Sequence, residues 1–249
     1  MTDPDRSRER DHERHRDRGR GRRVWGVASG EVATTAPRPA GRPSGGPPAA
    51  RAAALVLAAG ASTRMGRPKQ LALLAGKPLL EHVLAALDSP ESLVDEVVVA
   101  LGAGADEVKA RVALHGATPL LVEGWRGGMG EVLGGALEAL GDRHGAVVVC
   151  LGDQPLVTGA VVGRLVAAWR GGAGPVVSAG YHGRPGNPKL FDRRLFPELR
   201  RLRGDEGARG LLAAHPEWVH LVEVGTLGSD ADVDDEAALA RLEAMLQRT

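Results

Sequence analysis

The stretch Leu55–Lys69, LVLAAGASTRMGRPK, joins a short apolar run typical of a buried strand to a loop with two glycines. Glycine lets the backbone approach an anion closely, and successive backbone N–H groups in such a loop can point at phosphate oxygens. Three cationic side chains, Arg64, Arg67 and Lys69, add positive charge and are expected to be exposed. The loop is therefore predicted to bind a polyphosphate, and its strand begins the alternation of strands and helices that follows.

Two familiar phosphate-binding templates do not match this loop. The pattern GxGxxG fails because the glycines stand at 60 and 66, and GxxxxGK[ST] fails because Met65 occupies the position of the second glycine. A surface turn with solvated Arg and Lys side chains remains the alternative. The position directly after the first strand, together with three cations, favours phosphate binding.

From Ala52 onward, short runs rich in Val and Leu alternate with amphipathic stretches. Strands are expected at residues 55–59, 94–102, 118–124, 146–152, 175–181 and 219–225, and helices at 79–89, 106–116, 130–143, 158–169 and 234–247. Such alternation predicts a single α/β domain with a Rossmann-like, mostly parallel sheet flanked by helices on both faces. Ligands of such sheets bind at the carboxyl ends of the strands, so the site is expected where strands end in glycine or carboxylates.

Residues 1–51 lack this pattern, because an Arg-rich tract of mixed charge precedes a Pro/Gly/Ala-rich stretch, and both are expected to be disordered. The formal net charge is +1, but the first 23 residues hold nine Arg against six Asp and Glu, which leaves the remainder at about −2. The folded domain, residues 52–249, is therefore not basic, and no nucleic-acid partner is expected for it. A solvated tail is favoured, and a tether to RNA or an acidic partner is the alternative.

No run of the sequence approaches the ~20 apolar residues that a membrane helix needs, so no membrane partner is expected. Cys150 stands inside the apolar run AVVVCL, where a lone thiol is far more often a small buried hydrophobe than a nucleophile or a metal ligand. Without an export segment or cysteine pairs, the cytoplasm is the expected compartment.

Asp153 directly follows the apolar run AVVVCLG, so it is expected to project from the carboxyl end of a strand toward the phosphate loop. A hard cation could bridge a carboxylate in that position to an NTP. The alternative role, an Asx turn or a cap for the next helix, is weaker because Thr158 is better placed as the N-cap. With no local partner evident, Asp153 is predicted to be a metal ligand.

The segment LAAGASTRMGRPKQLALLAGKPLLEHVL, residues 57–84, resembles the signature of the molybdenum cofactor nucleotidyltransferases and their MobA-like relatives. Later stretches are similar to further motifs of that family, in the same order. These are EGWRGGMGEVLGGALEAL (123–140), LGDQPLV (151–157), GRPGNPKLF (183–191), LRGDEGARGLL (202–212) and DADVDDEAALARL (230–242). The resemblance extends over about 200 residues, and it implies the fold of the nucleotide-diphospho-sugar transferases, with residues 52–249 as the nucleotidyltransferase domain.

The resemblance implies a magnesium-dependent enzyme that transfers a nucleoside monophosphate from an NTP to a phosphorylated small molecule and releases pyrophosphate, with molybdopterin as the expected acceptor. It also implies that Asp153 and a carboxylate of DADVD hold Mg²⁺, where Asp232 is favoured and Asp230 and Asp234 are alternatives. An acidic first turn that complements the dipole of the last helix is the other interpretation of this cluster, and it fits Asp234 and Asp235 well.

The same resemblance assigns positions in the nucleotide and acceptor sites. Arg64 and Lys69 would contact the triphosphate and act as catalytic residues together with Asp153. The remaining predicted binding residues are Leu57, Ala58, Ala59, Gly60 and Ser62 in and before the loop, and Gly128, Met129, Gly186 and Pro188 later in the chain. No protein base is expected, because a terminal phosphate is already ionised at neutral pH.

Some positions depart from the family pattern. The family commonly has Asn at 123, small hydroxyl residues at 130 and 131, and His at 187, where this chain has Glu123, Gly130, Glu131 and Asn187. Two added carboxylates near an anionic acceptor would be unfavourable unless they face away, so the acceptor is left open. Ala59 stands where guanylyl-transferring relatives typically carry Gly, which favours CTP over GTP.

The expected partners are thus an NTP, with CTP favoured, a phosphorylated acceptor, and a recipient molybdoenzyme or its chaperone. A cytidylyl- or uridylyltransferase that acts on a sugar or polyol phosphate would share the loop and the reaction. A nucleotide-sugar glycosyltransferase is disfavoured because the only DxD triplets of residues 52–249 lie at 230–234, beside the last helix. The alternative of another class is a nucleotide-binding module tethered by its Arg-rich tail to RNA or another partner, which would not need Asp153.

Overall fold

The computed structural model describes residues 50–60 and 65–247, so the loop residues Ser62 and Arg64 and most of the predicted tail lie outside the described residues. The described part of the chain contains nine strands and seven α-helices, with short 3₁₀ helices between them. Within these ranges, no helix is long and apolar enough to cross a membrane.

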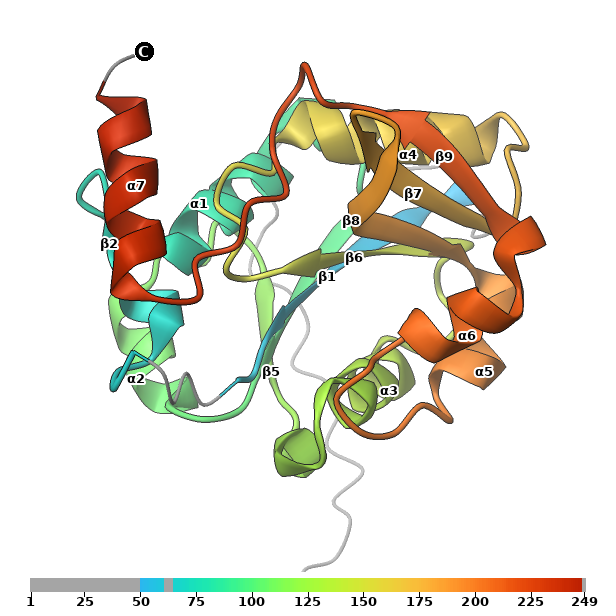
Figure 1. Cartoon of the computed structure of the whole chain (residues 1–249). Coiled ribbons are helices and arrows are strands. Elements are labelled where there is room, and N and C mark those ends of the chain that lie inside the picture. Colours follow the sequence, from blue (N-terminus) through green and yellow to red (C-terminus); the bar gives the residue numbers. More distant parts are fainter. Residues whose placement is uncertain (1–49, 61–64, 248–249) are drawn as a thin grey trace, which may run out of the picture. The chain divides into compact units, whose positions relative to one another are not determined.

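Seven of the strands form one sheet. The strands are β1 (Ala52–Ala58), β2 (Leu73–Leu74), β3 (Lys77–Pro78), β4 (Glu96–Leu101), β5 (Thr118–Leu121), β6 (Ala146–Leu151), β7 (Val176–Tyr181), β8 (Arg184–Asp192) and β9 (Val219–Glu223). The order in the sheet is β5-β4-β1-β6-β8-β7-β9, and neighbours run parallel except β8, which is antiparallel to both β6 and β7. The predicted Rossmann-like, mostly parallel sheet is therefore confirmed, with β1 between β4 and β6. Figure 1 shows β1 beside β6.

Helices cover both faces of this sheet (Figure 1). They are α1 (Leu79–Asp88), α2 (Ala105–Arg111), α3 (Met129–Leu140), α4 (Gly159–Arg170), α5 (Phe196–Leu199), α6 (Arg209–Ala214) and α7 (Glu236–Leu246). Successive side chains of β1 enter different apolar layers, because Ala54 and Val56 pack with residues of α1 and α4, whereas Ala53 and Leu55 pack with residues of α3 and α5. Cys150 is buried in the first of these layers, as predicted.

The strand β8 is not among those expected from the sequence, since two prolines and a glycine within nine residues are typical of a loop. The pairing of β7 with β8 is irregular between Ser178 and Gly180, opposite the segment that contains Gly186 and Pro188. Proline is tolerated in a sheet at such an irregularity, because the regular ladder of hydrogen bonds is interrupted there. Since β8 runs antiparallel to β6, its first residues lie at the carboxyl end of β6.

The helix cap expected at Thr158 is present, and Asp235, expected in the acidic first turn of the last helix, is the N-cap of that helix. The Thr158 side chain accepts a hydrogen bond from the Val161 N–H at 3.3 Å at the start of α4, and Asp235 accepts one from the Ala238 N–H at 2.7 Å at the start of α7. Asp153 is therefore not the cap of α4, which removes its main structural alternative.

A histidine is buried at the amino end of the sheet, opposite the end where β1 and β6 lead into their loops. His144 has no exposed surface, and its Nε2 lies 3.5 Å from Oε2 of Glu96. Neither ring nitrogen has a hydrogen-bond partner among the described residues. Burial lowers the pKa of His144 below its ordinary value of 6.5, while Glu96 opposes and Arg51 and Arg143 reinforce this shift. The folded protein therefore holds His144 mainly uncharged at neutral pH.

We expect His144 to make stability depend on pH. The unfolded chain binds a proton at this residue near pH 6.5 and the folded chain resists it, so the free energy of unfolding should decrease as the pH falls below about 6.5. His144→Leu should flatten this dependence between about pH 7.5 and pH 5.5, and His220→Gln at an exposed position should keep the wild-type slope. Urea midpoints at the two pH values measure the effect, and equal slopes for wild type and His144→Leu would contradict it.

Candidate active site

A cavity of about 280 Å³, here called the small cavity, lies at the carboxyl end of β1, where the predicted phosphate loop begins. Its walls come from the end of β1, the 3₁₀ helices η2 (Lys69–Leu71) and η4 (Glu123–Gly127), and the start of α3. Trp125 and Arg126 line it, and the guanidinium carbon of Arg126 lies 4.4 Å from the centre of the Trp125 ring. Loop backbone, an aromatic ring and cationic side chains are groups that suit a nucleotide.

A second cavity of about 870 Å³, here called the large cavity, is lined by β6, β8, part of segment 206–213 and several aspartates. Five residues line both cavities, namely Leu57, Lys69, Met129, Leu151 and Asp153. A ligand in the small cavity and a ligand in the large cavity would therefore meet at these side chains. Two of the five, Lys69 and Asp153, carry charge.

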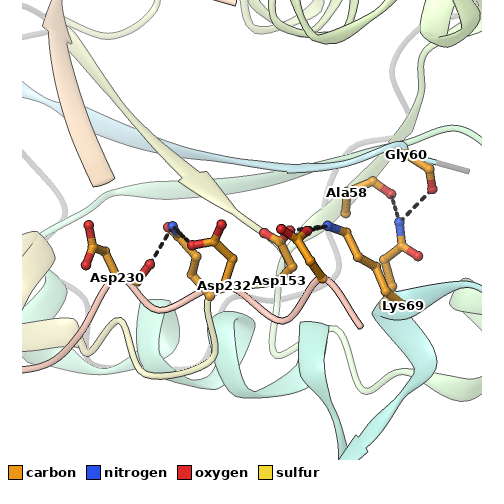
Figure 2. A network of polar contacts seen from close by, with 9 residues as sticks. Ala58, Gly60, Lys69, Asp153, Asp230 and Asp232 are labelled. Carbon is orange, nitrogen blue, oxygen red and sulfur yellow. Dashed lines mark hydrogen bonds and ion pairs between the residues drawn. The ribbon is translucent and has the colours of Figure 1, made fainter. Parts of the chain in front are cut away.

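Lys69 and Asp153 form an ion pair at this boundary, although they are 84 residues apart in the chain (Figure 2). The Lys69 ammonium also lies 3.3 Å from Oδ1 of Asp234. Burial by itself lowers the pKa of Lys69, but attraction to Asp153 and Asp234 outweighs burial, so the pKa lies above its ordinary value.

This ion pair corrects two expectations from the sequence. The Lys69 side chain is 22% exposed rather than open to solvent, and Asp153 is 13% exposed and has a partner. The physical reason is that β1 and β6 are neighbours in the sheet, so the segments that follow them meet at the same edge. Sequence periodicity predicts that both strands exist but does not say that they are adjacent.

A buried glutamine, which sequence reasoning missed, holds the backbone beside this pair. The Gln70 side-chain amide donates to the carbonyl oxygens of Ala58 at 2.8 Å and Gly60 at 3.2 Å, which ties η2 to the end of β1 (Figure 2). Gln70 is 2% exposed, so these bonds also satisfy donors that would otherwise be costly to bury. Gln70 therefore positions both Lys69 and the start of the phosphate loop.

A second buried glutamine fixes the segment 230–234, here called the acidic strap. The Gln154 side-chain amide donates to the Asp230 carbonyl at 2.9 Å and to Oδ1 of Asp232 at 3.4 Å. Gln154 directly follows Asp153 in the sequence, and that adjacency to a candidate metal ligand is the one signal that could have identified it. Its role is to hold the strap against the end of β6.

Several carboxylates gather along the strap. The aspartates that line the large cavity are Asp153, Asp230, Asp232 and Asp234. The Val233 N–H donates to the Asp153 carbonyl at 3.0 Å, and Figure 2 shows Asp230, Asp232 and Asp153 in one row that leads to Lys69. Within the described ranges, no three His, Cys, Asp or Glu side chains are grouped closely enough to hold a metal ion by themselves. Because Mg²⁺ is usually held by one or two carboxylates together with phosphate oxygens, these donors fit a hard cation that is shared with a phosphorylated ligand.

The start of α3 packs against segment 203–207, and this contact explains two departures from the family pattern. A Cβ at Gly130 would lie 2.6 Å from the backbone nitrogen of Arg203, so only glycine fits there. The Glu131 carboxylate accepts a hydrogen bond from the Gly204 N–H at 2.8 Å. Glu123 and Glu131 line a separate surface groove and neither the small nor the large cavity. The two added carboxylates therefore do not stand in the path of an anionic ligand.

Most predicted site residues that the structure describes border one of the two cavities. Leu57, Ala58, Ala59, Gly60, Gly128 and Met129 line the small cavity, and Gly186 and Asp232 line the large one. Pro188 is buried and lines neither cavity. Arg67, expected at the phosphate site, instead pairs with Glu236 of α7 at 2.8 Å. Ser62 and Arg64 lie outside the described residues.

Residues 54–219 match the family model of the MobA-like NTP transferase domain. The chain is 34% identical over 202 residues to nicotine blue oxidoreductase of Paenarthrobacter nicotinovorans, and the match covers 76% of this chain and 94% of that protein. It is 38% identical over 146 residues to the bifunctional protein GlmU of Acidiphilium cryptum, a match that covers 58% of this chain and 31% of GlmU. The chain thus spans about a third of the length of that second relative.

Solved structures show the same architecture. A homolog of Mycobacterium tuberculosis Rv0371c from Mycobacterium sp. strain JC1 is 34% identical with a TM-score of 0.70, over 80% of this chain and 98% of that one. Rv0371c of M. tuberculosis H37Rv in complex with manganese is 30% identical with a TM-score of 0.65, over 78% of this chain and 98% of that one. The fold and the family match support a nucleotidyltransferase as the class of enzyme. With residues 54–219 matched, well over half of its length, the chain belongs to the MobA-like NTP transferase family.

Proposed function

We propose that residues 52–249 form an enzyme that transfers a nucleoside monophosphate, CMP in preference, from an NTP to a phosphorylated small molecule with release of pyrophosphate. The observation that carries this proposal is the shared boundary of the two cavities at Lys69 and Asp153. Group transfer between two bound molecules requires their reacting atoms to meet at one place, next to groups that manage negative charge. The small cavity would hold the nucleotide and the large cavity the acceptor.

We assign the nucleotide to the small cavity because the end of β1 and the start of the phosphate loop form part of its wall. This part of the wall is a strand end that leads into a glycine loop, and it consists of Leu57, Ala58, Ala59 and Gly60. The backbone N–H groups of such a loop can approach phosphate oxygens closely. Ser62 and Arg64 are proposed to complete the triphosphate site from the loop. The preference for CTP rests on Ala59, whose methyl group stands where guanylyl-transferring relatives carry Gly.

A divalent cation is proposed at Asp153 and Asp232, with Asp230 and Asp234 as alternative ligands. Among the described residues, five carboxylates and three cationic side chains line the large cavity, a formal excess of two negative charges. Phosphorylated ligands would be repelled from such a cavity unless a cation offsets the excess. The manganese complex of Rv0371c supports a divalent ion, and we favour Mg²⁺ in the cell. When bound, the ion supplies charge neutralisation and alignment of phosphate oxygens.

The chain's own residues then have clear tasks in the reaction. An ionised phosphate oxygen of the acceptor forms a bond to the α-phosphorus of the NTP, the bond from that phosphorus to the bridging oxygen breaks, and pyrophosphate leaves with its electron pair. No protein base is required, because the attacking oxygen carries no proton. Lys69 and Arg64 would reduce the repulsion between the incoming phosphate and the triphosphate. Met129 and Leu57 supply apolar surface at the boundary where the two ligands would meet.

Molybdopterin is the proposed acceptor, in the cytoplasm, with a molybdoenzyme or its chaperone as the recipient of the product. A sugar or polyol phosphate acceptor remains the closest alternative, since it would use the same loop and reaction. We propose a screen of the four NTPs for pyrophosphate release, each with molybdopterin, a sugar phosphate, a polyol phosphate or no acceptor. Pyrophosphate release that requires molybdopterin would support the proposal. Release that requires a sugar or polyol phosphate would show that this compound, and not molybdopterin, is the acceptor.

A second candidate activity comes from the relative in P. nicotinovorans, which is named an oxidoreductase and is matched over 94% of its length. One fold supports several chemistries, so an oxidoreductase activity is the second candidate for this chain. Oxidation of NADH or NADPH in the presence of a quinone or dye acceptor would test it. Turnover in that assay without pyrophosphate release in any NTP assay would replace the proposed transferase.

We expect Asp153→Asn to reduce turnover strongly. The substitution keeps the size but removes the charge that would hold the metal ion, and loss of such a transition-state contact typically lowers the rate on the order of 10² to 10⁴-fold. Because Lys69 keeps Asp234 as a partner, metal-free stability should fall by only about 1–2 kcal/mol. Pyrophosphate release and urea unfolding without metal measure both effects, with the exposed Asp106→Asn as control. Turnover within twofold of wild type would remove Asp153 from the site.

Lys69→Met should make the stability of the protein more responsive to divalent ions. Methionine keeps the apolar stem but leaves Asp153 and Asp234 without their internal cation, so the metal-free protein should melt at a lower temperature. Magnesium or manganese at millimolar concentration should then raise the melting temperature of Lys69→Met more than that of wild type or of the exposed control Lys77→Met. An equal response of all three proteins would show that Lys69 and the metal ion do not share ligands.

A further inference from the structure

A second lysine of the large cavity lies away from the boundary with the small cavity. Lys189 stands on β8 opposite Val149 of β6, and its ammonium donates to the Gly186 carbonyl at 2.7 Å and to Oδ1 of Asn187 at 3.1 Å. Both acceptors are uncharged. Within the described residues Lys189 forms no ion pair, although its side chain lies partly inside the protein.

A second cation lines the same cavity close to Lys189. Arg209 stands at the first position of α6 and is exposed, and it has no hydrogen bond or ion pair to any other described side chain. Burial lowers the pKa of the Lys189 ammonium, Asp230 opposes this, and the positive charge of Arg209 lowers the pKa further. Because Lys189 and Arg209 repel each other, an anion bound between them would be attracted by both charges and would relieve their repulsion.

These cations lie at the opposite end of the strap from Lys69. Lys189 lies opposite Val149, four residues before Asp153, which is roughly 13 Å of extended chain. Its partner Gly186 packs directly against the Asp230 carboxylate, where any side chain in place of Gly186 would collide. Asp230 is the end of the row that is farthest from Lys69 in Figure 2. The large cavity therefore has cationic side chains at two separate places.

The remaining wall of the large cavity is mostly apolar. Its apolar lining includes Leu133, Phe191, Leu212, Pro216 and Val219. Such a surface suits the faces of a ring system better than a hydroxyl-rich sugar, whose polar groups would lose hydrogen bonds with water.

We propose that Lys189 and Arg209 form an anion subsite for the acceptor, distinct from the place where its phosphate reacts. The acceptor class that fits is a ring system with apolar faces and two anionic groups, one at the Lys69 boundary and one at Lys189 and Arg209. This inference rests on the proposed function for the use of the site, but the subsite itself is a binding property that can be measured without turnover. Asp230 is the carboxylate that competes with the second anion.

The test uses the full chain and two probes, naphthalene-2,6-disulfonate and naphthalene-2-sulfonate, in calorimetric titrations with millimolar Mg²⁺, which offsets the negative excess of the cavity, and without NTP. Wild type should bind the disulfonate more tightly than the monosulfonate. Lys189→Met and Arg209→Met should each weaken disulfonate binding by about tenfold, the usual size of a lost charge-assisted contact. Lys189→Arg should retain binding, and Arg164→Met, at an exposed position of α4, should leave it unchanged.

Binding of CTP with Mg²⁺ should stay within about twofold of wild type in all these variants, because Lys189 and Arg209 do not line the small cavity. Disulfonate affinity that is unchanged in both Lys189→Met and Arg209→Met would overturn the subsite. Equal loss of disulfonate and CTP binding, with a lower melting temperature, would also overturn it in favour of a structural role. If the subsite is present but no NTP yields pyrophosphate, the proposed function fails and the subsite stands.

Discussion

The register between β1 and β6 is the constraint on which the candidate active site depends. The two strands run parallel with Leu57 opposite Leu151, so both end at the same level of the sheet. The segments that follow them bring Lys69 and Asp153 into contact. A shift of the pairing by one residue would move each side chain of β1 to the opposite face of the sheet, where it would meet the other apolar layer. The two apolar layers fix this register, and the register in turn fixes the positions of Lys69 and Asp153, which belong to neither layer.

The ion pair between Lys69 and Asp153 is partly buried, and burial of charge is unfavourable unless attraction and hydrogen bonds compensate. Here the compensation comes from the attraction within the pair and from Asp234, while Gln70 and Gln154 hold the neighbouring backbone in place. The pair keeps a cation and a carboxylate in place before any ligand arrives. Under the proposed function, the lysine would turn to phosphate oxygens and the carboxylate to a metal ion, so little rearrangement would be needed.

The large cavity differs from the small one in the chemistry of its wall. Backbone and an aromatic ring dominate around the end of β1, whereas carboxylates, two further cations and apolar side chains surround the larger space. The antiparallel strand β8 is responsible for much of this difference, because it carries Gly186, Asn187 and Lys189 to the carboxyl end of β6. A carboxylate near a cavity does not always act in it, since Glu131 instead holds segment 203–207 against α3.

The sequence by itself determined the parts of this protein that depend on local pattern. The alternation of strands and helices, the Thr158 cap, the buried Cys150 and the place of Asp153 at a strand end all follow from neighbouring residues. Only the tertiary structure decided the antiparallel course of β8 and the partners of Lys69 and Arg67. Those contacts join residues 84 and 169 positions apart, and they depend on which strands become neighbours in the sheet. Periodicity records the burial of each segment but not its neighbours, so these pairings could not be read from the chain alone.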